Sequence, residues 1–366
     1  MHLDVRSSLE VDATSRIEVS ARGLSGAASG SGPVATYGGG SHGGVGGRGG
    51  SNAYGSYKAP RLPGSGGYGG RSGGGVVEVR VGDNGLVVLD GSLLANGATA
   101  SATQGAGAGG SISVTTPRLV GQGTISAAGG NSINGGAGGG GRIAVVGLVE
   151  EPDLQGGMLA PGGSSSGGYT AGAGTVFIQR RDQQHGDLII DNQGNSSSAA
   201  TPLVTVPAGT LTSLGGNVVS NAALSMSPDF YVGAYIKPNV AANGTETLLD
   251  DPYFTVLGND ATTFTIDGDP TVVADVGDEY RGLFIFDNLE IRGGAQVQTT
   301  ADILVLEGDR SSADTTTFHT TGGLQGTYLE LVDGGRLLIE GALRRCCLVA
   351  AAAGTSAAPA RCSSRT

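Results

Sequence analysis

The chain has 366 residues, of which 70 are Gly and none is Trp, and its formal net charge at pH 7 is −11. A surface of that charge repels nucleic acid and anionic lipid, so neither is an expected partner. The sequence holds no apolar run of the ~18 residues that a membrane-spanning helix needs, so no transmembrane segment is expected.

Short alternating apolar runs recur through the first half of the chain. Four of them start 35, 31 and 33 residues apart, at Val76, Ser111, Arg142 and Thr175. A second set recurs 32 and 33 residues apart, at residues 91–97, 123–129 and 156–162. Strands this short cannot bury a core alone, so each is expected to pair with the equivalent strand of the next unit.

This spacing predicts an all-β fold for residues 1–185, a right-handed parallel β-helix or β-solenoid with Gly-rich loops and coils of about 32 residues. The same half holds 49 of the 70 glycines. Two alternatives stay open for these stretches. Residues 38–75 could be a flexible Gly/Ser linker. A bundle of polyglycine-type extended helices would need Gly at every third residue, and the runs are too irregular to require it.

Residues 186–341 keep a strand rhythm but are acidic, with 5 Lys/Arg against 21 Asp/Glu. Much of the aromatic content falls between Phe230 and Phe286. We expect a small antiparallel β element, inserted or appended, at about residues 225–286, and a return to the solenoid at about 288–341.

The two ends of the chain resemble each other. Residues 9–19 align with residues 329–339 without a gap, at a constant offset of 320. We expect the chain to be about one period of a longer tandem protein, with any export signal upstream of it. Residues 342–366, which hold all three cysteines, are predicted to be an unstructured or frameshifted tail; a genuine Cys-bearing segment is the alternative.

Several Gly-rich blocks carry a resemblance to a known class of protein. Residues 38–44 (Gly-Gly-Gly-Ser-His-Gly-Gly), the run ending at Gly70, and residues 89–97 and 138–145 look like the Gly-rich parallel β-helix regions of very large, mainly bacterial, extracellular proteins. Residues 231–282 are similar to an element that recurs between such helices. The resemblance implies a secreted or cell-surface repeat protein of adhesin type, and it carries over no catalytic residue.

Candidate chemistry is sparse. Five side chains offer hard oxygen ligands to Ca²⁺, although turn roles are the alternative: Asp267, Asp269, Asp275, Asp278 and Glu279. The closest approach to a catalytic constellation is the run Arg180–Asp187, which includes His185, and a polar exit from the last strand is the alternative. The glycine-flanked His42 could ligate a metal or contact a sugar, with a solvated loop side chain as the alternative. No other cofactor is indicated, because no Gly-rich stretch carries a phosphate-binding lysine.

These observations favour a non-catalytic structural or adhesive module of a larger secreted or cell-surface repeat protein. The solenoid would act as a rigid spacer, and its loops or its aromatic sheet would contact glycans or other surface proteins. The alternative is a carbohydrate-active parallel β-helix enzyme, a polysaccharide lyase or hydrolase, which requires acidic and basic side chains that converge in one groove.

Overall fold

The computed structural model describes residues 1–26, 30, 34–101, 103–197, 199–242 and 252–299, followed by the backbone of short strands between Asp302 and Ala350. Within these residues the chain is built from β-strands and contains one 3-10 helix, η1 (Pro270–Val272). The predicted all-β class is confirmed. Part of the predicted insertion, residues 243–251, and most of the predicted tail, residues 351–366, lie outside the described residues.

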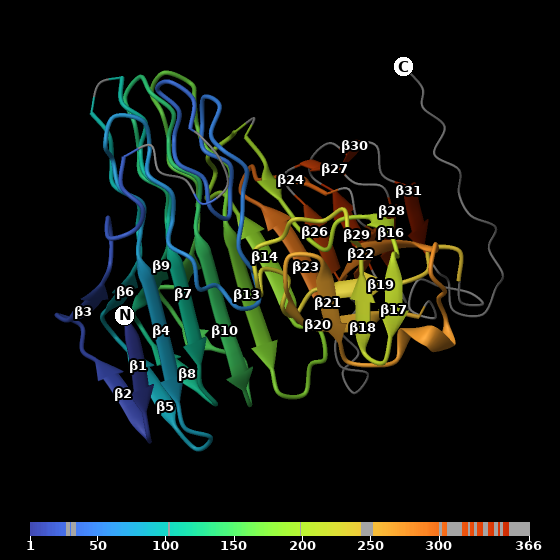
Figure 1. Ribbon diagram of the computed structural model, residues 1–366. Helices are drawn as coiled ribbons and strands as arrows, with labels where there is room; N and C mark the ends of the chain where they lie inside the picture. The colour runs from blue at the N-terminus through green and yellow to red at the C-terminus, as the bar shows by residue number, and fades with distance from the viewer. Residues whose placement is uncertain are drawn as a thin grey trace.

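The largest mainly parallel sheet runs through the whole molecule (Figure 1). All its neighbouring strands are parallel except the pair β13 and β14. Val77, Ile112, Ile143 and Val176 are register partners in succession, so the runs that recur in the sequence lie side by side. In spatial order the strands are β1 (His2–Val5), β4 (Val76–Val81), β7 (Ser111–Thr115), β10 (Arg142–Leu148), β13 (Thr175–Arg180), β14 (Asp187–Asp191), β23 (Asn288–Arg292), β26 (Thr317–Thr320) and β29 (Arg336–Ile339).

Two smaller parallel sheets accompany its first half. One contains β2 (Ser8–Val11), β5 (Leu86–Leu89), β8 (Leu119–Gly121) and β11 (Asp153–Leu154). The other contains β3 (Arg16–Glu18), β6 (Ser92–Leu94), β9 (Thr124–Ser126) and β12 (Met158–Leu159). Each successive group of three strands therefore supplies one strand to each sheet.

The apolar residues of these strands form one core. Alternate positions point to the same face of a strand, so Val77, Val79 and Val81 of β4 are buried while Arg80 is exposed. Equivalent residues of the next strands, such as Ile112 and Ile143, are fully buried in the same cluster. Burial of this alternating face stabilises strands that are too short to be stable individually.

The Gly-rich segments form a second packed layer beyond the strands, where the loops rise at the top of Figure 1. In residues 105–110 the backbone N–H groups donate in rotation to three neighbouring segments, at 2.7–3.0 Å. Gly105 and Ala108 donate to the first segment, at Tyr68 O and Ser65 O. Ala106 and Gly109 donate to the second, at Gly136 O and Gly139 O, and Gly107 and Gly110 donate to the third, at Ala98 O and Ala95 O. Residues 136–141 show the same rotation toward residues 37–40, 169–172 and 127–130.

A rotation with a period of three residues is the signature of extended helices with three residues per turn, which make no internal hydrogen bonds. The polyglycine-type bundle therefore describes these segments, although glycine does not recur at every third position. We call them the glycine bundle. Residues 38–75 belong to it through bonds such as Gly39 N–H to Gly47 O and Gly74 N–H to Ala108 O, so they are not a flexible linker.

Close backbone contact explains the glycines of the bundle. A Cβ atom placed on Gly138 would lie 1.9 Å from the carbonyl oxygen of Gly107. One placed on Gly107 would lie 2.0 Å from the oxygen of Ser72. Both contacts are with backbone atoms that are themselves hydrogen-bonded, so no side-chain movement relieves them.

The second half of the chain mixes antiparallel and parallel pairing. Its sheet has the order β17 (Ser213–Gly215), β18 (Val218–Ser220), β21 (Thr263–Ile266), β20 (Phe254–Asn259), β19 (Tyr235–Lys237), β22 (Glu279–Phe286), β25 (Asp302–Val305), β28 (Tyr328–Leu331) and β31 (Cys347–Ala350). The pairs from β17 to β22 are antiparallel, so this arrangement begins about a dozen residues before the predicted limit of 225. The short strand β16 (Gly209–Thr210) pairs with β22.

Parallel pairing resumes at β23, close to the predicted residue 288. A four-stranded sheet also forms here from β15 (Thr201–Pro202), β24 (Gln296–Gln298), β27 (Gly323–Gln325) and β30 (Leu343–Arg344). Strands β30 and β31 lie in the segment predicted to be an unstructured or frameshifted tail. They pair in parallel with β27 and β28, because a ladder needs only an open strand edge and not a particular side-chain pattern.

We predict that Gly138→Ala destabilises the protein strongly, because its Cβ would collide with the Gly107 carbonyl. Overpacking of this kind costs about 1–3 kcal/mol. Gly215→Ala is the control, since nothing lies within 4 Å of a Cβ at that position. Urea unfolding of both variants checks the prediction, and an unchanged stability for Gly138→Ala would contradict the close packing of the bundle.

Candidate functional site

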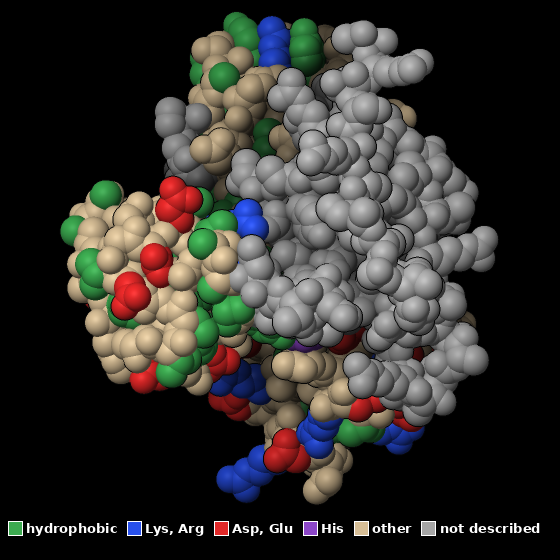
Figure 2. Space-filling model, turned by 90° about the vertical axis from the view of Figure 1, so that its right-hand side faces the viewer, with side chains coloured by type: hydrophobic (Ala, Val, Ile, Leu, Met, Phe, Trp, Pro, Cys, Tyr) green, Lys and Arg blue, Asp and Glu red, His purple; other side chains and the backbone are tan. Residues whose placement is uncertain are grey.

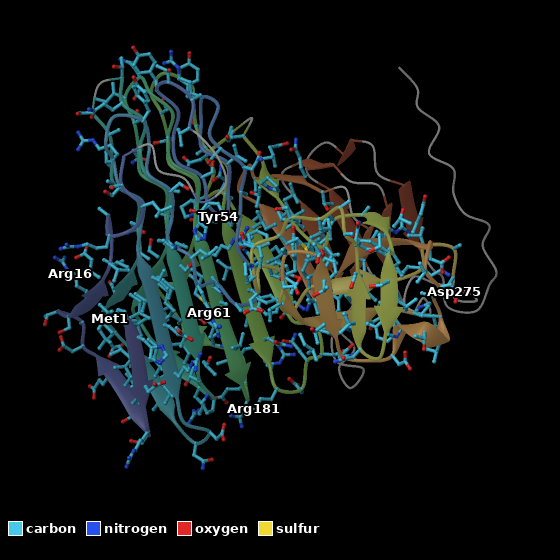
Figure 3. The ribbon with its side chains drawn as sticks, viewed as in Figure 1. Met1, Arg16, Tyr54, Arg61, Arg181 and Asp275 are labelled. Carbon is cyan, nitrogen blue, oxygen red and sulfur yellow. The ribbon has the colours of Figure 1, made fainter. Side chains whose placement is uncertain are left out.

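A buried polar cluster lies where the glycine bundle meets the strands, near Tyr54 in Figure 3. The Nδ1–H of His42 donates to Gly109 O at 2.9 Å, and the His42 ring lies 4.9 Å from the ring of Tyr54. The Arg142 guanidinium donates to Tyr54 O at 2.9 Å and to the Thr175 hydroxyl at 3.1 Å. His42 and Arg142 are 0% and 2% exposed, so the cluster is closed to ligands.

Burial sets the protonation of this cluster. Desolvation, together with the charge of Arg142, lowers the pKa of His42 to about 3. Desolvation also lowers the pKa of Arg142 to about 10, so that side chain stays cationic at neutral pH. His42, considered in the sequence as a polar loop residue, is therefore a neutral side chain inside the protein.

A second polar junction joins residues 51–63 to the antiparallel sheet. Lys58 Nζ donates to the Tyr235 hydroxyl at 2.9 Å, and the same hydroxyl lies 2.8 Å from His185 Nδ1. Asp287 accepts bonds from the backbone N–H groups of His185 and Gly186. Desolvation lowers the pKa of Lys58 to about 8. The cavity beside Lys58 has a volume of about 20 Å³, enough for one water, and Lys58 is half-buried.

The predicted polar run Arg180–Asp187 does not converge on one point. Arg180 forms ion pairs with Glu151 and Asp182, while Arg181 pairs with Asp83 at the end of the strands opposite the glycine bundle (Figure 3). Asp187 accepts bonds from the side-chain amides of Gln183 and Asn288. His185 is 1% exposed and belongs to the junction with Lys58.

The five candidate calcium ligands lie around turns of the antiparallel region, near Asp275 in Figure 3. Asp269 caps η1 by accepting from Thr271, and Asp267 accepts from the Thr255 N–H. Asp278 accepts from Asn239 and from the Asp275 N–H, and Glu279 lies in β22. Among the described residues, no group of three or more His, Cys, Asp or Glu side chains is arranged to hold a metal ion.

A groove of about 970 Å³ runs between residues 202–210 and β22. Its described lining includes Tyr231, Tyr280 and Arg281, and Glu279 is the one carboxylate in it. Glycoside hydrolysis generally uses two carboxylates that flank the scissile bond.

The strongest surface feature lies at the outer end of the glycine bundle. The guanidinium of Arg48 is stacked between two tyrosine rings, 5.0 Å from the centroid of Tyr37 and 4.7 Å from that of Tyr169. The ring of Tyr68 meets Tyr37 edge-on at 5.3 Å. We call Tyr68, Tyr37, Arg48 and Tyr169 the tyrosine–arginine row. Its three tyrosines are 36–39% exposed, and Figure 2 shows basic and hydrophobic side chains together at this end.

The bundle holds the backbone of each tyrosine of the row. Gly136 donates to Tyr37 O at 2.8 Å, Gly105 to Tyr68 O at 2.9 Å, and Ala137 to Tyr169 O at 3.0 Å. The Arg48 side chain donates to Asn134 O at 2.9 Å. Residue 105 and residues 134–137 therefore hold the four members of the row in one surface.

Two members of the row adopt a conformation that favours glycine. Tyr37 has φ 64° and Arg48 has φ 56°. Left-handed backbone is uncommon for side chains of this size and costs about 1 kcal/mol or more per residue. Ala21, Gln193 and Asp229 also have positive φ, and strain of this kind is enriched at binding sites, so the row is a candidate contact surface.

This row is not among the sites expected from the sequence. Its residues are separated by up to 132 positions between Tyr37 and Tyr169, and nothing in a single sequence shows which loops end side by side. One feature of the sequence could have indicated these residues: tyrosine and arginine interrupt Gly-rich runs in which most other residues are small.

Comparison with protein-family models, curated proteins and solved structures finds no match to this chain. No helix among the described residues has the length and apolar character needed to cross a membrane.

We predict that His42 makes the protein less stable in mild acid. Its pKa is about 3 in the folded protein, against an ordinary value of 6.5, so below pH 6.5 the unfolded chain binds the proton first. Its contribution is complete above pH 6.5 and is lost as pH falls toward 3, at up to about 1.4 kcal/mol per pH unit. Urea unfolding between pH 7 and 4 should show a shallower pH slope for His42→Asn than for the unmodified chain.

His2 is the control for that slope. It is exposed, and hydrogen bonds to Asp4 and Glu78 raise its pKa, so its contribution has the opposite sign and is present at low pH. His2→Asn should therefore steepen the loss of stability in acid. Equal slopes for the His42 variant and the unmodified chain would show that His42 is not buried.

We predict that Arg48→Gly is more stable than Arg48→Ala by about 1 kcal/mol. Both variants lose the contacts of the guanidinium, but only glycine relieves the left-handed backbone. Thermal unfolding of the two variants measures the difference. If alanine is equally stable, the backbone at position 48 is unstrained.

Proposed function

We propose that this chain is a non-catalytic structural and adhesive module of a larger secreted or cell-surface repeat protein, and that the tyrosine–arginine row is its contact surface for glycans. The observation that carries the proposal is the set of three exposed tyrosines, fixed side by side at the outer end of the glycine bundle. Sugar rings present faces of C–H groups, which stack on aromatic rings, while hydroxyl groups at their edges bond to polar tips such as the tyrosine hydroxyl.

Within this proposal the three parallel sheets of the first half are the sides of a right-handed parallel β-helix. The groups β4–β6, β7–β9 and β10–β12 would each form one coil. Coil-to-coil registers such as Val87 with Leu119 and Leu93 with Ile125 support that interpretation. A stack of coils is stiff along its axis, because each added coil extends every ladder at once.

The adhesive role is supported by the way in which the row is held. A loop that orders only when it binds loses conformational entropy at that moment, and affinity falls accordingly. Here the backbone is bonded before any ligand arrives, so that cost is reduced.

The runner-up is a carbohydrate-active β-helix enzyme. The groove along β22 is the place where such chemistry would be sought, and Glu279 and Arg281 line it. A lining with one described carboxylate supports the non-catalytic proposal over this one.

The test is incubation of the full chain with immobilised polysaccharides, both neutral and acidic, with retained protein and released reducing ends scored together. We expect retention without cleavage, and at least tenfold weaker retention for Tyr169→Ala. Leu257→Ala, which removes an exposed side chain of β20, is the matched control.

If the chain cleaves a polysaccharide and Glu279→Gln abolishes that cleavage, the carbohydrate-active enzyme is the correct function and the adhesive module is not. Equal retention of the Tyr169 and Leu257 variants would move the contact surface away from the row. If no polysaccharide retains the chain, the proposed glycan contact is wrong.

A further inference from the structure

The charges around the tyrosine–arginine row differ in sign from those of the whole protein. Residues 19–75, 91–149 and 154–181 contain no Asp or Glu, whereas the chain as a whole carries a net charge of −11. The first of these segments carries five basic residues, Arg22, Arg48, Lys58, Arg61 and Arg71. Lys58 lies in the junction with the antiparallel sheet and Arg61 lies at the level of the strands (Figure 3), so Arg48 and Arg71 are the basic groups placed near the row, in segments that contain no carboxylate.

The basic groups near the row lack acidic partners within the described residues. Arg48 has one hydrogen-bond acceptor there, the Asn134 carbonyl. Arg71, in the same turn as Tyr68, donates to the neutral side chains of Gln104 and Ser101. By contrast, three exposed arginines in the strands and their connections form ion pairs: Arg16 with Glu18, Arg80 with Glu78 and Arg118 with Glu150.

The Arg48 guanidinium is also oriented in advance. Its Cζ lies 5.0 Å and 4.7 Å from the centroids of two tyrosine rings, and its backbone has φ 56°. A guanidinium carries five N–H donors, and Asn134 uses one of them. A planar group with free donors matches a carboxylate or sulfate in the two-bond geometry that gives arginine its specificity for such anions.

We propose that the row binds anionic sugars, with a carboxylate or sulfate on Arg48 and the sugar rings on the adjacent tyrosines. This inference rests on the proposed function and gives it a substrate class. Nucleic acid carries a higher charge density than a uronate or sulfated sugar chain, so the negative charge on the rest of the protein disfavours nucleic acid more strongly than an anionic glycan.

The experiment measures binding of the full chain to polygalacturonate, chondroitin sulfate, chemically desulfated chondroitin, dextran and a single-stranded DNA oligonucleotide. Arg48→Gln removes the charge, and Arg48→Lys keeps the charge without the planar donors. Arg16→Gln is the matched control, because Arg16 is exposed and begins β3, well below the outer end of the bundle that carries the row (Figure 3). Thermal unfolding verifies that each variant is folded.

We expect tighter binding to one or both anionic sugars than to dextran, weakened by salt, and a loss of tenfold or more in Arg48→Gln. Arg48→Lys should recover only part of it, and Arg16→Gln should bind normally. Comparison of polygalacturonate, chondroitin sulfate and desulfated chondroitin shows whether Arg48 prefers a carboxylate or a sulfate.

Three results would overturn the inference. Dextran bound as tightly as the anionic sugars, with unchanged binding by Arg48→Gln, would leave a neutral-glycan adhesin. DNA bound as tightly as the sugars, with the same dependence on Arg48, would show a general polyanion site. No binding to any probe would remove both the inference and the glycan contact on which it rests.

Discussion

The structure depends on one constraint, which is that a buried backbone N–H or C=O must be hydrogen-bonded. In the β-sheets the ladders meet it. In the glycine bundle it is met by extended segments that share their N–H groups among three neighbours, as residues 105–110 do. Segments can approach that closely only where side chains are absent. The bonding pattern therefore explains why a Cβ atom at Gly107 or Gly138 would collide with a backbone oxygen of the neighbouring segment. The high glycine content is thus a packing requirement and not a sign of flexibility.

The same constraint fixes the surface. Tyr37, Arg48 and Tyr169 lie on different segments, yet they meet because residues 134–137 donate to the Tyr37 and Tyr169 carbonyls and accept from the Arg48 side chain. Each of these side chains belongs to a segment whose other residues are mostly small, and two of them hold a left-handed backbone in which glycine would be more stable. Rigid support and local strain together distinguish this row from the buried polar cluster, where His42 is enclosed by the fold.

Much of the architecture could be predicted from sequence. The spacing of Val77, Ile112 and Ile143 corresponds to their register in the sheet, because a fixed period in sequence places equivalent strands side by side. The three-way bonding of the bundle was harder to predict, since alanine stands at positions such as Ala106 and Ala108 and masks the period of three. The calcium candidates were chosen by composition, whereas the structure uses Asp269 and Asp278 as acceptors within turns. The row itself could not be predicted, because it depends on which loop ends are neighbours.

Amide hydrogen exchange of the Gly-rich segments tests the central claim most directly. If residues 105–110 and 136–141 are bonded in rotation, their amides should exchange as slowly as those of the buried strand β10, because exchange requires the bundle to open. Exchange within seconds at neutral pH, while β10 stays protected, would show that these segments are mobile loops and that the tyrosine–arginine row has no rigid support.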